Sequence, residues 1–431
     1  MVGISGSIAA VEIVRVIREL IRHGAEVRAV MTSEATRLVT PEAIQFATGA
    51  PPVLQLTGDV EHVSWLGPGE GRADLLLLAP ATANTISKIA HGIDDTAVTS
   101  FASVSLGGGA PILLAPAMHA HMGQNPAVRE NLERLRGWGV EIVHSFAAEG
   151  EEKLASPEEI AAAVLHRLGR PPWAGRRVVV IGGAARESID DVRSVTNESS
   201  GATAVQLATQ AHYRGADTEL WASSLEVPIP SFLAVHRWRS VGDLRTLLRR
   251  RAATLRSADV VLVPAALADY TLPRRDGKIS SRAQRSLTLK LSLAPKILPE
   301  VRRHAPPPAR VVGFKLTAGL GEADREAEAR RLLAEANLDW VVANDRASMG
   351  PGPTDLLVVT RRGERRRYSG AKSDVAGKLL DDLGRELSEL RPEEQPRRGG
   401  RRAVPRPRLR SAGPTRRARR PRTAPSSARS S

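Results

Sequence analysis

Short apolar runs that alternate with helix-length segments are the feature that most constrains what this 431-residue chain can fold into. Residues 1–6 end a short strand, and Ser7 can cap a helix whose apolar positions recur at helical spacing until Gly24. The pattern continues downstream, where the sequence predicts a helix at 126–136 and strands at 26–32, 75–78, 112–115 and 140–143. Repeated strand-helix alternation predicts an α/β fold built on a doubly wound parallel sheet.

The alternation stops at a linker and then begins again. A predicted helix at 157–168 ends near Gly169, and residues 170–175 form a Pro/Gly-rich stretch. A new strand, RRVVVIGG, follows directly. Because a chain of this length can form two domains with separate cores, we expect two doubly wound parallel-sheet domains, at 1–170 and 171–390.

The positive charge is concentrated in a tail. Residues 391–431 contain 14 Arg and 2 Glu and so carry +12 of the net charge of +15. We expect this segment to be disordered, because it nearly lacks large apolar residues and cannot offset its ordering entropy. A polyanion-binding arm is the alternative to a solvated extension. Only 3% of the chain is aromatic, so a specific nucleic-acid-binding protein is the least favoured function class.

Composition excludes several kinds of site. The chain has no cysteine, which rules out disulfides, thiolate metal sites and a cysteine nucleophile. It has no apolar run long enough to span a membrane and no basic-then-apolar signal segment at its start. We therefore expect a cytoplasmic protein without membrane contacts.

Chemically capable side chains follow the predicted strands of the first domain. His62 lies in EHVSW, LAPATAN spans residues 78–84, and PAMHAHM spans residues 116–122. The last two segments come directly after strands, and open α/β sheets bind ligands at the carboxyl ends of their strands. The sequence therefore predicts one site lined by these segments.

The glycine-containing turn at residues 3–7 adds a phosphate-binding feature. Its backbone amides, the Ser7 hydroxyl and the helix that follows could hold a phosphate, although strand-to-helix turns favour Gly and Ser in any such fold. A dinucleotide would need three spaced glycines and an acidic residue after the second strand, where this chain has Met31-Thr32-Ser33. A mononucleotide phosphate is therefore favoured over NAD.

Two sets of motifs carry a resemblance to a known family. The first half contains GISGSIAA, MTSEATRLVTP, EHVSWL, LAPATANTISKIAHGIDD and LLAPAMHAHM. The second half contains GGAARESIDDVR, TNESSG, ALADY, GKI, VGF and AND. The first set resembles flavin-dependent cysteine decarboxylases. Both sets together resemble bifunctional coenzyme A biosynthesis proteins, in which phosphopantothenoylcysteine decarboxylase is fused to phosphopantothenate–cysteine ligase, and the resemblance covers residues 1–390.

For the first half, the resemblance implies a flavodoxin-like decarboxylase domain in which FMN makes the loss of CO2 possible. The FMN phosphate would lie near Gly6 and Ser7. The flavin ring would lie near Thr32, Ser33, Ala81, Thr82 and Met118. His62 matches the family's essential histidine, which orients or deprotonates the substrate; the alternative is a helix histidine that only meets solvent. His119 stands where relatives usually have Asn, and a neutral imidazole can still donate a hydrogen bond to the substrate carboxylate.

The same domain departs from the family pattern in two places. Many relatives have a flap cysteine that reprotonates the enethiolate, whereas this chain has AAEGEEKL at residues 147–154. The acid would then be another flap group, a water, or missing. Relatives usually have several more apolar residues before the glycine turn, which implies a shortened opening strand and weaker flavin retention.

For the second half, the resemblance implies a Rossmann-like ligase domain. CTP would activate 4'-phosphopantothenate as an acyl cytidylate, and the amine of cysteine would displace CMP. The backbone amides that would bind phosphates belong to Gly182, Gly183, Ser199, Ser200 and Gly201. Asn197 would contact the acyl intermediate, Phe314 would pack on cytosine, and Asp269 would bind the ribose or Mg2+. Further CTP contacts would come from Pro295, Lys296, Ile297 and Leu298. Lys278 matches a lysine that neutralises developing phosphate charge; the alternative is a solvated loop lysine.

Lysines that relatives usually carry near the triphosphate are not evident at residues 330–336, so either nucleotide affinity is reduced or arginines of that stretch substitute for them. Arg330 and Arg331 are the nearest cations in the stretch 330–336, and Ala202 stands where relatives often have Lys or Arg. This loss favours an alternative function, a flavin-binding decarboxylase or regulatory subunit with a degenerate ligase domain. The favoured prediction is the bifunctional enzyme, which makes 4'-phosphopantetheine. A homo-oligomer is expected, since relatives assemble their flavin sites between subunits and pair their ligase domains.

Overall fold

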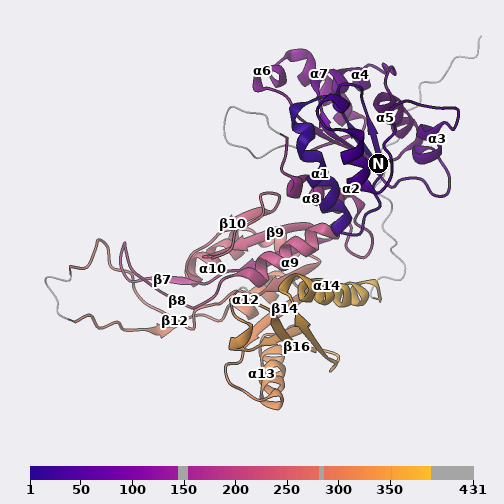
Figure 1. Ribbon diagram of the computed structural model, residues 1–431. Helices are drawn as coiled ribbons and strands as arrows, with labels where there is room; N and C mark the ends of the chain where they lie inside the picture. The colour runs from indigo at the N-terminus through magenta and orange to yellow at the C-terminus, as the bar shows by residue number, and fades with distance from the viewer. Residues whose placement is uncertain (144–153, 281–285, 351, 390–431) are drawn as a thin grey trace, which may run out of the picture. The chain divides into compact units, whose positions relative to one another are not determined.

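The computed structural model describes residues 1–143, 154–280, 286–350 and 352–389 (Figure 1). Most of the predicted flap, residues 147–153, and the tail that we expect to be disordered lie outside these ranges, so both predictions stay predictions. Among the described residues, no helix is both long and apolar enough to cross a lipid bilayer.

The first part of the chain folds around a five-stranded sheet in which all neighbouring strands are parallel. In the spatial order β2-β1-β3-β4-β5, the strands are Ala29–Met31, Val2–Ile4, Leu76–Ala81, Ile112–Pro116 and Glu141–Ile142. This arrangement confirms the predicted parallel sheet. Because β2 and β3 lie on either side of β1, the ends of β1 and β3 flank a switch point of the kind at which open sheets bind ligands.

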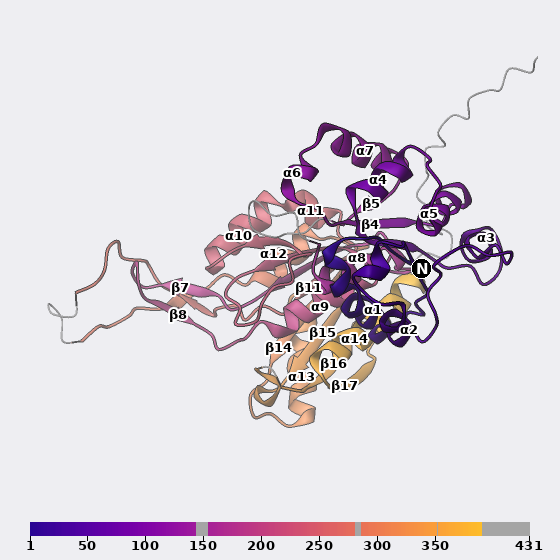
Figure 2. The ribbon, with the colours of Figure 1, turned by 45° about the horizontal axis from the view of Figure 1, so that its top comes forward.

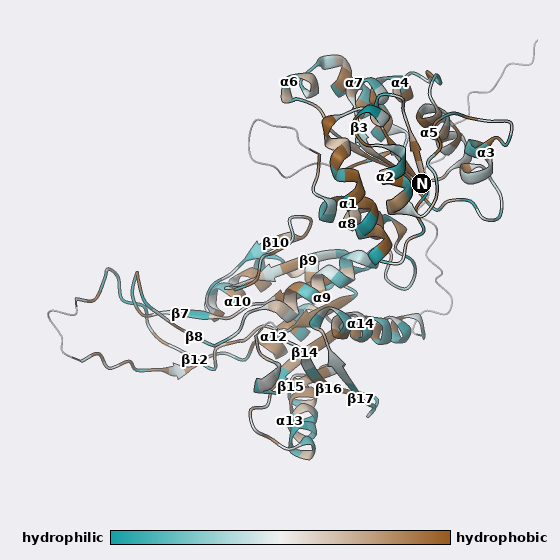
Figure 3. Ribbon diagram, viewed as in Figure 1, coloured by the Kyte–Doolittle hydropathy of each residue, from teal (hydrophilic) through white to brown (hydrophobic). Residues whose placement is uncertain are grey.

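Helices cover both faces of this sheet. The core on one face includes α1 (Ile13–Arg22), α2 (Pro41–Thr48) and α8 (Pro157–Leu168). The core on the other includes α3 (Glu61–Leu66), α4 (Ala83–Ala90), α5 (Ala97–Gly108) and α7 (Pro126–Gly137). Shorter elements are η1 (Ile8–Glu12), η2 (Ala35–Arg37) and α6 (Ala120–Gly123). Figure 3 shows apolar residues concentrated on α1 and on the strands beside it, which is where the core forms.

The second part of the chain folds around an eight-stranded mixed sheet of order β10-β9-β6-β11-β14-β15-β16-β17. In chain order these are β6 (Arg177–Gly182), β9 (Asp217–Ala222), β10 (Ala234–Arg237), β11 (Val260–Val263), β14 (Arg310–Leu316), β15 (Trp340–Asn344), β16 (Thr354–Thr360) and β17 (Arg365–Gly370). The strands from β10 to β15 are parallel, as predicted, but β16 and β17 are antiparallel to their neighbours. The segment between β15 and β16 is too short for a crossover helix, so the chain turns back.

Helices again lie on both faces. One core includes α9 (Ala202–Tyr213) and α14 (Lys372–Glu389), and the other includes α10 (Val241–Arg250), α11 (Ala252–Arg256), α12 (Ile297–His304) and α13 (Glu322–Glu335). The remaining elements are η3 (Arg346–Ser348) and two antiparallel ribbons, β7 (Arg186–Ser188) with β8 (Ser194–Thr196) and β12 (Tyr270–Thr271) with β13 (Ser292–Leu293). Figures 1 and 2 both show β7 and β8 on the side of this domain away from α14.

Candidate functional site

A buried serine ties the turn after β1 to the turn after β3. Ser5 Oγ donates to the Pro80 carbonyl oxygen at 2.6 Å and accepts from the Thr82 N–H at 3.0 Å. Thr82 in turn begins α4, because its hydroxyl accepts from the Thr85 N–H at 3.3 Å. The predicted flavin-binding residues of these two turns therefore lie close together.

The turn after β2 packs closely on the turn after β1. A Cβ on Gly6 would lie 2.3 Å from Glu34 Cβ, so only glycine fits at this position. The backbone N–H groups of Gly6, Ile8 and Ser33 have no hydrogen-bond acceptor among the described residues. Unpaired N–H donors on two packed turns suit an anion such as a phosphate.

The turn after β4 completes this edge of the sheet. The Ala117 N–H donates to the Ala81 carbonyl oxygen at 3.0 Å, which joins the turn after β4 to the end of β3. Thr32, Ala81 and Met118 are buried at these turns, whereas Ser33 is exposed. The fold thus brings the residues predicted to bind flavin to the carboxyl ends of adjacent parallel strands.

The two predicted catalytic histidines lie on opposite sides of the first domain. His62 is on α3, with its ring centroid 6.3 Å from that of Phe101, and its buried Nδ1 has no hydrogen-bond partner within the described part of the chain. His119 caps α6, where its Nδ1 accepts from the His121 N–H at 3.3 Å. A neutral His119 with this contact carries its hydrogen on Nε2, which can donate to a ligand. Figures 1 and 2 both show α3 and α6 on opposite sides.

A cavity of about 870 Å3 in the second domain gathers most of the predicted nucleotide-binding side chains. The predicted residues that line it are Asn197, Asp269, Pro295, Lys296, Ile297, Leu298 and Phe314. Asn197 Nδ2 donates to the Leu267 carbonyl oxygen at 2.9 Å, which leaves its amide oxygen available. Lys296 Nζ donates to Asp269 Oδ1 at 3.0 Å, and both side chains are mostly exposed, so a ligand can replace this ion pair at little cost.

The glycines and serines predicted to bind phosphates shape neighbouring turns and do not line this cavity. They are Gly182, Gly183, Ser199, Ser200 and Gly201. A Cβ on Gly182 would lie 2.1 Å from Ala204 Cβ, so glycine lets α9 pack on β6. Gly183 has a φ of 89°, and Gly201 has a φ of 72° where it begins α9. The Ser199 and Ser200 hydroxyls each accept from a backbone N–H of this turn at 3.4 Å.

Lys278 also lies outside the lining of the cavity. It belongs to a segment held beside the β7–β8 ribbon, where the Ile279 N–H donates to Asp190 Oδ2 at 3.1 Å. Hydrogen bonds from the backbone N–H groups of Arg193 and Val192 lower the pKa of Asp190 to about 2. An ionised Asp190 therefore anchors the segment that carries Lys278.

The fold brings three cations to the cavity, of which the sequence interpretation considered only Arg331, as a substitute for the lysines of relatives. Lys315 lies on β14, Arg331 on α13 and Arg346 on η3. Arg331 pairs with Glu328 at 2.7 Å, and Arg346 lies 3.9 Å from a carboxylate oxygen of Glu198. The available sequence signals were weak: Arg331 falls in the stretch where relatives carry lysines, and Arg346 directly follows the AND motif.

Both halves of the chain match known families. Residues 1–169 match the Flavoprotein family, and residues 173–386 match the family described as the DNA/pantothenate metabolism flavoprotein C-terminal domain. The chain is 41% identical over 390 residues to the coenzyme A biosynthesis bifunctional protein CoaBC of Thermococcus kodakarensis, covering 90% of this chain and 95% of that protein. It is 32% identical to the protein of the same name from Methanocaldococcus jannaschii, covering 89% and 92%. Among solved structures, the FMN-dependent cysteine decarboxylase SpaF matches at 33% identity and a TM-score of 0.33, covering 38% of this chain and 95% of that one.

Proposed function

The chain belongs to the family of coenzyme A biosynthesis bifunctional proteins, and from this membership we propose how each half works. Its two activities are those of an FMN-dependent phosphopantothenoylcysteine decarboxylase and a phosphopantothenate–cysteine ligase. We propose that ligation consumes CTP and passes through the acyl cytidylate of 4'-phosphopantothenate. Ligation precedes decarboxylation, because the decarboxylase acts on the amide that the ligase forms, and the final product is 4'-phosphopantetheine.

The cavity in the second domain is the observation that carries the ligase proposal. Phe314 offers an aromatic face to the cytosine ring, and the free amide oxygen of Asn197 faces the acyl phosphate. A bound triphosphate would replace the exposed Lys296–Asp269 pair, so that Lys296 would hold phosphate and Asp269 would hold Mg2+ or the ribose. Among the described residues, no group of three or more His, Cys, Asp or Glu side chains could hold a metal ion.

Positive side chains around the cavity support nucleotide activation. The substrate carboxylate attacks the α-phosphate and pyrophosphate leaves, after which the amine of cysteine attacks the acyl carbon and CMP leaves. Lys315, Arg331 and Arg346 line the cavity and would hold the triphosphate, and Lys278, whose anchored segment lies outside the lining, would approach the α-phosphate. These cations favour an active ligase over the degenerate-ligase alternative.

The turns of the first domain fit FMN. The unpaired N–H groups of Gly6, Ile8 and Ser33 suit its phosphate, which moves Ser33 from the ring, where the resemblance put it, to the phosphate. Buried Thr32 and Met118 lie at the strand ends where the ring would rest. When bound, FMN would accept two electrons from the substrate at the carbon that bears the thiol, which makes the loss of CO2 possible, and would return them after CO2 has left, so that there is no net oxidation.

Each histidine then has a separate task in decarboxylation. His62, whose buried Nδ1 lacks a partner, accepts the proton of the substrate thiol or orients it. His119 donates from Nε2 to the substrate carboxylate and so fixes the bond that breaks.

The separation of these histidines implies that the decarboxylase site is completed between copies of the chain. Both are expected to contact one small substrate, yet α3 and α6 lie on opposite sides of one copy. An assembly that brings His62 of one copy to His119 of the partner subunit resolves this conflict. Co-assembly of inactive His62→Asn chains with poorly active His119→Leu chains should therefore raise decarboxylation above that of either variant alone; no increase would favour a site within one chain.

Product analysis of the purified chain tests the two activities separately. With phosphopantothenate, cysteine, Mg2+ and CTP, we expect release of pyrophosphate and formation of phosphopantothenoylcysteine, followed by release of CO2. We also expect the purified protein to show the absorption spectrum of a flavin. Phe314→Ala should weaken CTP binding and leave the flavin spectrum unchanged. Failure to consume CTP with both substrates present would refute the CTP-dependent ligase, whatever the decarboxylase does.

A further inference from the structure

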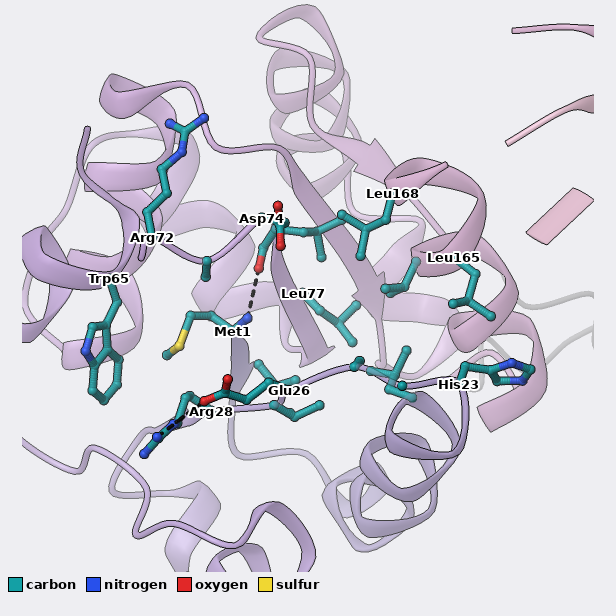
Figure 4. Close-up of a pocket in the computed structure, with 18 of the residues that line it drawn as sticks. Met1, His23, Glu26, Arg28, Trp65, Arg72, Asp74, Leu77, Leu165 and Leu168 are labelled. Carbon is teal, nitrogen blue, oxygen red and sulfur yellow. Dashed lines mark hydrogen bonds and ion pairs between the residues drawn. The ribbon is translucent and has the colours of Figure 1, made fainter. Parts of the chain in front are cut away.

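Cations lie beside cavities in both domains, but their partners differ. In the first domain, a cavity of about 580 Å3 lies at the amino ends of β1, β2 and β3, away from the strand ends proposed to hold FMN, and Arg28 beside it pairs with Glu26 at 3.3 Å (Figure 4). In the second domain, Lys372 lies beside the cavity proposed to bind the nucleotide and forms no ion pair with any described residue. Neither proposed reaction gives Lys372 a role.

Lys372 holds the turn that brings a cation to this cavity. The turn η3 presents Arg346 to the cavity, and Met349, directly after η3, lines it as well. Between them, Ser348 is only 5% exposed, and its carbonyl oxygen accepts from Lys372 Nζ at 3.0 Å. This oxygen lies at the carboxyl end of η3, where lysine side chains commonly donate to the last carbonyl groups. Lys372 therefore fixes the end of the turn that carries Arg346.

Other contacts fix different atoms of η3. At the beginning of the turn, Asp345 Oδ1 accepts from the Arg346 N–H at 2.6 Å. The Ser348 hydroxyl accepts from the Asp355 N–H at 3.0 Å, which joins the turn to β16. Neither contact reaches the Ser348 carbonyl oxygen, so removal of the Lys372 ammonium would take the donor from an acceptor in a buried residue.

The Lys372 ammonium carries its charge in a half-buried position. Burial lowers the pKa of Lys372, and no described carboxylate forms an ion pair that would offset the loss of hydration. A triphosphate in the neighbouring cavity would supply negative charge beside η3. The charged form of Lys372 is therefore favoured most when the nucleotide is bound.

The methylene chain of Lys372 has a separate contact. Lys372 and Phe314 both line a void of about 10 Å3, and Phe314 packs against one core of the domain. The apolar stem can therefore support Phe314 while the ammonium at its end reaches η3. An unbranched side chain without the charge would keep the first contact and lose the second.

We propose that Lys372 is a positioning residue of the ligase. Its ammonium holds the carboxyl end of η3, so that Arg346 faces the triphosphate, and Lys372 itself does not touch the nucleotide. This inference rests on the proposed CTP-dependent ligation.

The test begins with binding of CTP and CMP to the full chain. Lys372→Met removes the ammonium and keeps an unbranched apolar side chain beside Phe314, and Lys378→Met is the matched control because Lys378 is an exposed lysine of the same helix. We expect Lys372→Met to raise the dissociation constant of CTP by about tenfold and that of CMP by less than about twofold, because CMP lacks the phosphates that Arg346 would hold. Lys372→Arg should recover most of the CTP affinity, since a guanidinium can also donate to the Ser348 carbonyl oxygen.

A double-mutant comparison separates positioning from a general loss of stability. Arg346→Gln alone should also weaken CTP binding by about tenfold. If Lys372 acts through Arg346, adding Lys372→Met to Arg346→Gln should weaken binding by less than about threefold more. A role confined to folding would weaken binding equally in both backgrounds.

Amide hydrogen exchange tests the turn without nucleotide. The Ser348 and Met349 N–H groups donate to the Asp345 and Arg346 carbonyl oxygens at 2.9 and 3.0 Å, and their exchange should be at least about tenfold faster in Lys372→Met than in Lys378→Met. Equal exchange, equal CTP affinity in these two variants, or full additivity with Arg346→Gln would each overturn the proposal. An unmodified chain that binds no CTP would refute the proposed ligase itself, whereas the exchange comparison would still decide whether Lys372 holds η3.

Discussion

Replacement of Gly6 by alanine should weaken FMN binding and leave the second domain active. The added Cβ would lie 2.3 Å from Glu34 Cβ and 3.1 Å from the Glu34 carbonyl carbon. Since carbon atoms pack at ~3.5–4.0 Å, the turn after β2 must retreat by more than ~1 Å. Overpacking of this kind costs about 1–3 kcal/mol of folding free energy, or about 2–12 °C in midpoint for a domain of this size.

The expected effect on FMN follows from the same displacement. The N–H groups of Gly6 and Ser33 lie on the two turns that must separate, so one hydrogen bond to the phosphate is lost. A hydrogen bond to a charged group contributes about 1.5–3 kcal/mol, which raises the FMN dissociation constant by about 10-fold to 150-fold.

Titration of FMN fluorescence measures this change directly. Gly58→Ala is the matched control, because a Cβ there meets nothing within 4 Å. Ligation by the same preparation reports whether the second domain remains folded. An FMN dissociation constant within about twofold of that of Gly58→Ala, at an equal midpoint, would refute the assignment of this turn to the phosphate.

Other perturbations separate the two halves of the chain. His62→Asn should abolish CO2 release from phosphopantothenoylcysteine and leave ligation nearly unchanged, because its unpaired Nδ1 lies in the first domain; undiminished decarboxylation would remove His62 from the site. His119→Leu should bind FMN normally but decarboxylate poorly, whereas His119→Asn should keep measurable activity because an amide also donates; the reverse ranking would contradict carboxylate binding. Lys278→Gln should slow pyrophosphate release by about a hundredfold or more while flavin content persists, and full ligation in this variant would exclude a role for the Lys278 charge. Burial on folding lowers the pKa of the Met1 amine from 8.0 to about 6. Between pH 6 and pH 8 the unfolded chain therefore binds more protons than the folded chain, so the free energy of unfolding should rise with pH across that range. Denaturant titrations should show that acetylation of Met1 removes this rise; an unchanged slope would assign it to other groups.

Local sequence was enough to predict the edge of the first sheet where the residues expected to bind flavin lie. The apolar runs before Gly6, Thr82 and Met118 are strands because their side chains are buried on both faces of a parallel sheet. Thr82 begins a helix because its hydroxyl accepts a hydrogen bond from the N–H of Thr85, only three residues along the chain. In the second domain, the family resemblance and not a local pattern singled out Phe314 and Asn197, and both line one cavity of the structure.

The sequence by itself therefore determined the strands and helices, the parallel pairing of most strands, and the turns that carry reactive residues, because periodicity, capping and turn chemistry act over a few residues. Only the tertiary structure decided which of these turns meet. It placed His62 and His119 on opposite sides of one domain, brought Arg346 to the cavity of the second domain and left Lys278 outside the lining of that cavity. Such relations depend on strand order and on contacts between residues far apart in the chain, which no local pattern specifies.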